Sequence, residues 1–122
     1  MRIFTLLLPA VMLSGCGIFT NLVGSWDGTC EFSAYDMDVE IDIEEDKGGE
    51  LAGEAEVSFL YYGYQFELEG EVEGKRDGSD VEIDLDFGEN GSMEIVGELT
   101  DSDTIEGECT SGGVDADIEL ER

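Results

Sequence analysis

Histidine is absent from the 122-residue chain, and basic residues are scarce. Without histidine, catalysis by a Ser-His-Asp or Cys-His group is excluded. The usual ligand sets of zinc and iron sites are missing as well, because there is no histidine and the three cysteines are assigned below to acylation and a disulfide. Paired carboxylates remain as a route to glycoside cleavage, but they must face each other in a cleft. The acids here alternate with apolar residues and are expected on outward strand faces, so we expect a protein that is not an enzyme.

Five Lys and Arg residues stand against 32 Asp and Glu, giving a formal net charge of −27. Nucleic-acid binding needs clustered basic side chains that neutralise phosphates, so the charge excludes it. Binding to anionic lipid headgroups is excluded on the same grounds. High charge often indicates disorder, but the placement of the acids indicates folded strands instead.

Apolar and acidic residues alternate strictly in four segments and more loosely in four others. A period of two residues is typical of strands with one buried face. The strict segments are 37–43, 66–72, 81–87 and 114–120, and the looser ones are 26–32, 51–59, 93–99 and 105–109. No helical pattern appears after Cys16.

Short turn-rich connections join these eight segments, so successive strands are expected to be antiparallel neighbours. The prediction is an all-β domain over residues 24–122, an antiparallel eight-stranded up-and-down meander. Its apolar face is buried most simply if the sheet forms a closed or flattened barrel. A two-sheet β-sandwich is the alternative.

The N-terminus carries a short apolar run that ends in Leu13-Ser14-Gly15-Cys16. This motif resembles the lipobox of bacterial lipoproteins, where signal peptidase II cuts before a cysteine that receives acyl chains. The resemblance implies a signal peptide over residues 1–15 and an acylated Cys16 followed by a tether to residue 23. Two or three acyl chains would hold the protein on a membrane. The alternative is an ordinary secretory signal with an accidental cysteine.

The lipoprotein resemblance also implies a location, the bacterial cell envelope. Gly17 follows the cysteine where an aspartate would resemble an inner-membrane retention signal. The outer membrane is therefore favoured if the host has one.

Gly24-Ser25-Trp26 in the first strand resembles the Gly-x-Trp signature of lipocalins and related calycin barrels. In that family a basic residue from the last strand packs across the tryptophan, which implies that role for Arg122. Small bacterial lipoproteins that open with Gly-x-Trp-x-Gly are similar at Gly24 to Gly28.

Cys30 and Cys109 lie in apolar phase, and in an exported protein they are expected to form a disulfide. Two free buried thiols are the alternative. In a simple barrel the last strand would lie between the strands that carry Cys30 and Cys109. The distance across two strand spacings exceeds the usual Cα–Cα distance of a disulfide. Either the barrel is flattened there or the last strand does not insert.

A two-residue turn at Tyr62-Gly63 sets the register of one hairpin, with Tyr61 opposite Tyr64. Its outward pairs are then Glu56 with Glu69 and Glu54 with Glu71, the candidate ligands for weakly bound Ca²⁺ or Mg²⁺. A solvated acidic face and a docking face for a basic partner are the alternatives. Extended through the other turns, the register predicts one outer row: Glu40, Glu54, Glu71, Glu82, Glu98, Glu106 and Asp117.

Small residues fall at one inner level in the same register: Ala55, Gly70, Gly97, Gly107 and Ala116. One interpretation is a pocket for a small apolar ligand beside Trp26. The alternatives are that core side chains fill the space, or that the glycines permit sharp curvature.

Three tyrosines crowd the hairpin tip: Tyr61, Tyr62 and Tyr64. Tyrosine is enriched in binding surfaces, although aromatic residues also cap the open end of a core. We expect Tyr62 to be exposed. The function expected from the sequence is a membrane-anchored binding or interaction module, with a purely structural acidic surface protein as the alternative.

Overall fold

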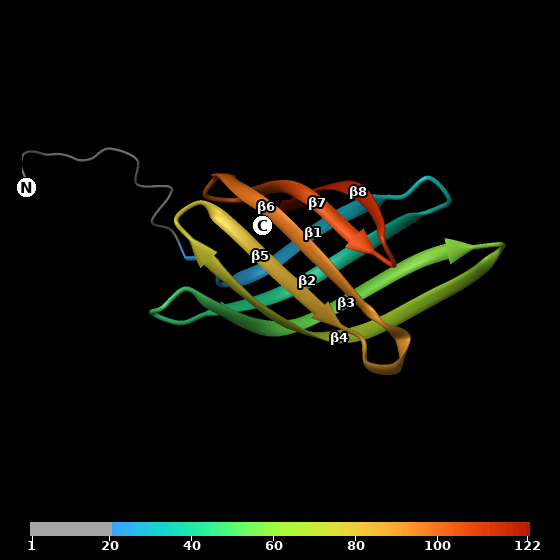
Figure 1. Ribbon diagram of the computed structural model, residues 1–122, viewed down its shortest axis with the longest axis horizontal. Helices are drawn as coiled ribbons and strands as arrows, with labels where there is room; N and C mark the ends of the chain where they lie inside the picture. Colours follow the sequence, from blue (N-terminus) through green and yellow to red (C-terminus); the bar gives the residue numbers. More distant parts are fainter. Residues whose placement is uncertain (1–20) are drawn as a thin grey trace, which may run out of the picture.

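The computed structural model describes residues 21–122, which form a closed antiparallel barrel in which each strand pairs with its neighbours in sequence (Figure 1). The strands are β1 (Gly24–Glu31), β2 (Asp36–Glu45), β3 (Glu50–Tyr61), β4 (Tyr64–Asp77), β5 (Asp80–Asp86), β6 (Ser92–Asp101), β7 (Thr104–Ser111) and β8 (Val114–Glu121). A single 3-10 turn, η2 (Gly88–Asn90), lies between β5 and β6. The predicted eight-stranded meander is confirmed, and it closes as a barrel rather than as a sandwich.

The alternation of apolar and acidic residues determines which face of each strand is buried. Apolar side chains from all eight strands form one core inside the barrel. Strand β2 illustrates the pattern, because Met37, Val39, Ile41 and Ile43 are buried while the acids between them are exposed. Within residues 21–122 there is no helix long and apolar enough to cross a membrane.

The hairpin of β3 and β4 has the predicted register, with Tyr61 opposite Tyr64, Glu56 opposite Glu69 and Ala55 opposite Gly70. Extended through the other turns, the predicted register is right between β6 and β7, where Glu98 pairs with Glu106, and wrong at the other turns. Corrected pairs are Glu40 with Glu56 and Asp42 with Glu54, Glu71 with Asp86, Asp80 with Glu98 and Glu82 with Val96, and Glu106 with Glu119. Each error is an even number of residues, which leaves every side chain on its predicted face. Alternation fixes the face of a strand, whereas the turns fix its register.

The predicted row of small inner residues is wrong for the same reason. Gly70 lies beside the Phe87 ring. Gly97 instead pairs with Val81, and Val81 pairs with Arg76, six residues further along β4 than Gly70. Gly107 pairs with Gly97 on one side, as predicted, but with Ile118 rather than Ala116 on the other.

The predicted disulfide between Cys30 of β1 and Cys109 of β7 is present, with the two Cα atoms 6.3 Å apart. Strand β8 inserts between these strands, but it shares only one ladder pair with β1, Asp27 with Glu121. The barrel is therefore flattened, so that the inner faces of β1 and β7 meet. Because 79 residues separate the cysteines, the crosslink is expected to stabilise the fold by about 4 kcal/mol in the chain-entropy model.

Arg122 closes the end of the barrel at which the described chain begins. Its guanidinium carbon lies 4.7 Å from the centre of the Trp26 ring, the arrangement expected above for these two residues. The same guanidinium donates hydrogen bonds to the carbonyl oxygens of Asn21 (2.9 Å) and Val23 (3.0 Å). It also bonds the Ser102 carbonyl and pairs with Asp103 in the turn between β6 and β7.

Leu22 plugs the same end of the barrel and is completely buried. Its carbonyl accepts a 2.9 Å hydrogen bond from the Trp26 indole. Its N–H donates to Glu45, whose other carboxylate oxygen pairs with Arg76 at 3.0 Å. Segment 21–23 is thus part of the folded domain.

We predict that Arg122→Met lowers the free energy of unfolding by about 2 kcal/mol, because it removes charge-assisted hydrogen bonds and a cation–π contact. Urea titration of the purified domain measures the change. Lys47→Met is the matched control: it also removes one positive charge, but from an exposed turn. Equal losses in the two variants would assign the effect to net charge and contradict the prediction.

Candidate functional site

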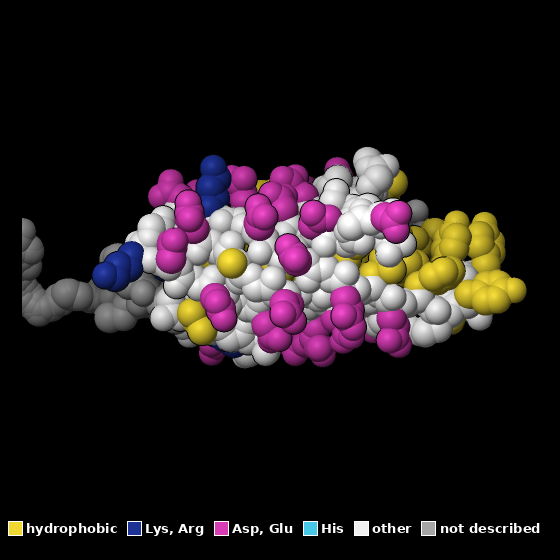
Figure 2. All heavy atoms as spheres, turned by 90° about the horizontal axis from the view of Figure 1, so that it is seen from below, with side chains coloured by type: hydrophobic (Ala, Val, Ile, Leu, Met, Phe, Trp, Pro, Cys, Tyr) yellow, Lys and Arg dark blue, Asp and Glu magenta, His cyan; other side chains and the backbone are white. Residues whose placement is uncertain are grey.

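The hairpin of β3 and β4 carries a cluster of exposed apolar side chains at one end of the barrel. We define the aromatic tip as Leu60, Tyr61, Tyr62, Tyr64 and Phe66. Their exposed fractions are 58%, 37%, 84%, 72% and 41%. Figure 2 shows hydrophobic side chains gathered at this end, whereas acidic side chains cover the barrel wall. An apolar patch of this kind on an otherwise charged surface is typical of an interaction site.

The inner rings of this hairpin continue the core toward the open end of the barrel. The Tyr35 ring lies 5.0 Å from the Phe59 ring and 5.5 Å from the Tyr61 ring, measured between centroids. Phe59 and Phe66 stack with centroids 5.2 Å apart. These contacts hold Tyr61 and Phe66 in place, so the rings further out stand on a rigid base.

Tyr62 is held in an unfavourable backbone conformation. Its φ is 52° and that of Gly63 is 81°, as a two-residue hairpin turn requires at both positions. Asparagine or glycine normally occupies the first position, because other residues lose about 1 kcal/mol there. The Tyr62 side chain is 84% exposed, so burial of the ring offsets little of this cost.

The phenols of the tip interact with one another. A side-chain hydrogen bond with Tyr62 raises the pKa of Tyr61 above its ordinary value. The Tyr61 and Tyr62 rings meet edge to face with centroids 4.4 Å apart. The raised pKa keeps the Tyr61 phenol neutral at physiological pH.

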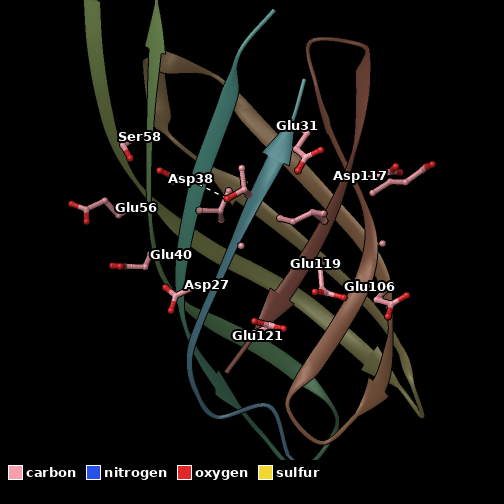
Figure 3. Close-up of a pocket in the computed structure, with 16 residues that line it drawn as sticks. Asp27, Glu31, Asp38, Glu40, Glu56, Ser58, Glu106, Asp117, Glu119 and Glu121 are labelled. Carbon is pink, nitrogen blue, oxygen red and sulfur yellow. Dashed lines mark hydrogen bonds between the residues drawn. The ribbon is translucent and has the colours of Figure 1, made fainter. Parts of the chain in front are cut away.

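A second feature is an acidic hollow of about 1100 Å³ over the seam between β1 and β8 (Figure 3). Ten of its sixteen lining residues are acidic: Asp27, Glu31, Asp38, Glu40, Glu56, Glu106, Glu108, Asp117, Glu119 and Glu121. Figure 3 shows their carboxylates on neighbouring strands around the seam. The hollow attracts positive charge, but its acids are spread over five strands.

The four predicted cation ligands lie on the outer face of β3 and β4. Glu54 opposes Glu71, and Glu56 opposes Glu69. They line a second hollow together with Glu40 and Asp42. Within the part of the chain that the structure describes, no group of three or more acids is arranged to hold a metal ion.

The glycines predicted to line an inner ligand pocket lie where neighbouring atoms leave no room for a side chain. A Cβ atom at Gly97 would lie 2.7 Å from the Glu106 carbonyl oxygen, and one at Gly107 would lie 2.1 Å from that of Val96. A Cβ atom at Gly70 would lie 2.7 Å from the Phe87 ring. Trp26 is completely buried in the core. This geometry favours the alternative in which these glycines permit close packing of the wall.

Sequence reasoning identified the tyrosines but missed Tyr35 and the acidic hollow over the seam. Tyr35 lies two residues before Met37, in phase with the buried side chains of β2 but outside the predicted segment 37–43. The hollow forms only because β8 returns to β1, so no local pattern marks it. Cys16, the predicted lipidation site, lies outside the described residues.

The fold and site define a class of protein, a small acidic eight-stranded up-and-down β-barrel with an aromatic hairpin at one end. No protein-family model matches the chain, and a search of curated proteins finds no match.

We predict that Tyr62→Asn raises the free energy of unfolding by about 0.5 kcal/mol, because asparagine tolerates the left-handed conformation better than tyrosine. Thermal or urea unfolding measures the change. Tyr64→Asn serves as the control, since Tyr64 lies in the strand beside the turn and asparagine is unfavourable in strands. Destabilisation by Tyr62→Asn would show that the exposed ring contributes to folding after all.

Proposed function

We propose that this protein is a lipid-anchored, non-catalytic component of the bacterial cell envelope that binds a protein partner through the aromatic tip. The observation that carries the proposal is Tyr62, a large ring 84% exposed on a backbone that disfavours it. Strain without a folding benefit is typical of residues kept for binding. Rigid tyrosines also supply contact area at little cost in side-chain entropy.

The positions of the two ends fit display from a membrane. The described chain begins at one end of the barrel, and the β3–β4 hairpin projects at the other (Figure 1). Asn21 lies five positions after Cys16, a span of at most about 18 Å. Acylation of Cys16 would thus hold the barrel close to the bilayer with the tip pointing away from it. The outer membrane is the favoured location in a host that has one.

The acidic wall restricts what the tip can bind. A formal charge of −27 repels nucleic acids and anionic lipid headgroups. Carboxylates surround the apolar rings of the aromatic tip. The surface that fits the tip best is therefore a protein surface with an apolar centre and basic residues around it. Binding at the tip needs no cofactor and no cavity inside the barrel.

The lipid anchor is tested by Cys16→Ser. We expect this variant to accumulate unprocessed and without acyl chains, as measured by intact mass, because the acyl acceptor is lost. Cys30→Ser removes a cysteine outside the motif and is expected to be cleaved and acylated normally. Normal processing of Cys16→Ser would contradict the lipoprotein assignment.

The binding surface is tested by retention of envelope proteins from the host on the immobilised domain. We expect a discrete protein to be retained by the wild type and lost from the double variant Tyr62→Asn, Tyr64→Ser, because the exposed rings are removed. Val96→Ser is the matched control, since Val96 is an apolar side chain 47% exposed on the barrel wall. Equal retention by all three proteins would contradict binding at the tip.

A further inference from the structure

Strand β4 is twice as long as its neighbour β5, and this leaves part of one edge open. β4 has 14 residues and β5 has 7. Pairing with β5 begins at Glu71, opposite Asp86. From Tyr64 to Glu69 no strand within residues 21–122 pairs with this edge of β4, although β3 pairs with the other edge throughout. Such an edge presents backbone N–H and C=O groups to an incoming strand.

The side chains along the open edge alternate in character. Tyr64, Phe66 and Leu68 continue the apolar inner face of the barrel, and the first two are exposed. Gln65, Glu67 and Glu69 point to the acidic outer face and are all exposed. A strand added here would therefore meet apolar side chains on one face and carboxylates on the other.

We propose that the open edge of β4 binds an extended segment of the partner by β-strand addition, and that this segment alternates basic and apolar residues. The proposal rests on the proposed function of the aromatic tip and specifies the chemistry of the partner. Its apolar residues would pack beside Phe66 and Tyr64, and its basic residues would lie beside Glu67 and Glu69. Main-chain hydrogen bonds would supply affinity, while the alternating side chains would supply specificity.

Charge decides against a second copy of this chain as the occupant. Two copies joined along this edge would bring Glu67 and Glu69 of one chain close to acidic residues of the other. Like charges across strands are unfavourable, and each chain carries a net charge of −27. Acids on an edge strand are a common device against such self-association.

The test uses fluorescent peptides and the folded domain. A Lys-Val-Lys-Val-Lys-Val-Lys peptide is expected to bind at least about tenfold more tightly than Lys-Lys-Lys-Val-Val-Val-Lys, which has the same composition without the alternation. Backbone N-methylation gives a second signature, because alternate N–H groups of a strand point to opposite sides. Methylating one alternate set should abolish binding, and methylating the other should preserve it.

Two protein variants locate the bound peptide. Glu67→Lys lies on the open edge and is expected to weaken binding about tenfold. Glu73→Lys makes the same change on the outer face of the same strand, where β4 is paired on both sides, and is expected to have much less effect. Amide hydrogen exchange should slow in residues 64–69 when the alternating peptide is bound.

Equal binding of both peptides, or equal loss in both lysine variants, would overturn strand addition in favour of general charge attraction. No binding of either peptide would also overturn it. Peptide binding that is lost in Tyr62→Asn but leaves exchange in residues 64–69 unchanged would overturn strand addition while preserving the tip as a binding surface. The retention experiment on envelope proteins reports on the tip independently of these peptides.

Discussion

The return of β8 to β1 is the contact on which the rest of this structure depends. Each strand has one apolar face, and that face stays away from water only if the sheet closes. The backbone contributes little at this seam, a single ladder pair between Asp27 and Glu121. Side chains hold it instead, with Arg122 bonded to Asn21 and Val23 at one end and the Cys30–Cys109 disulfide toward the other.

Acidic residues line the outside of this seam. Asp27 and Glu121 are both acidic, and Glu106 and Glu119 face each other on the adjacent pair of strands. These acidic residues line the hollow over the seam. Closure thus buries most apolar side chains and leaves the acids on the wall. Val23, Val96 and Val114 are exposed singly, whereas the β3–β4 hairpin exposes five apolar side chains together.

Much of the fold could be predicted because its signal is local. The alternation over 37–43 and its counterparts assigns strands and faces, and the Tyr62-Gly63 turn sets the register of its hairpin. Some turns are longer or later than expected, as at Gly78-Ser79 between β4 and β5. Such a turn shifts the strand register by an even number of residues. The alternation of apolar and acidic residues is unchanged by an even shift, so the sequence pattern does not reveal it. The open edge of β4 depends on that register, so the sequence predicted the tyrosines of the site but not the strand edge beside them.

The central claim is that contact with a partner is confined to the hairpin end of the barrel. Site-specific photo-crosslinking in the host envelope tests this claim most directly. A photoreactive residue is placed in turn at Tyr62, at Glu67 and at Val96, which is exposed on β6 of the barrel wall. The account predicts one discrete adduct from Tyr62 and Glu67 and none from Val96. Adducts of equal yield from all three positions, or from Val96 alone, would contradict it.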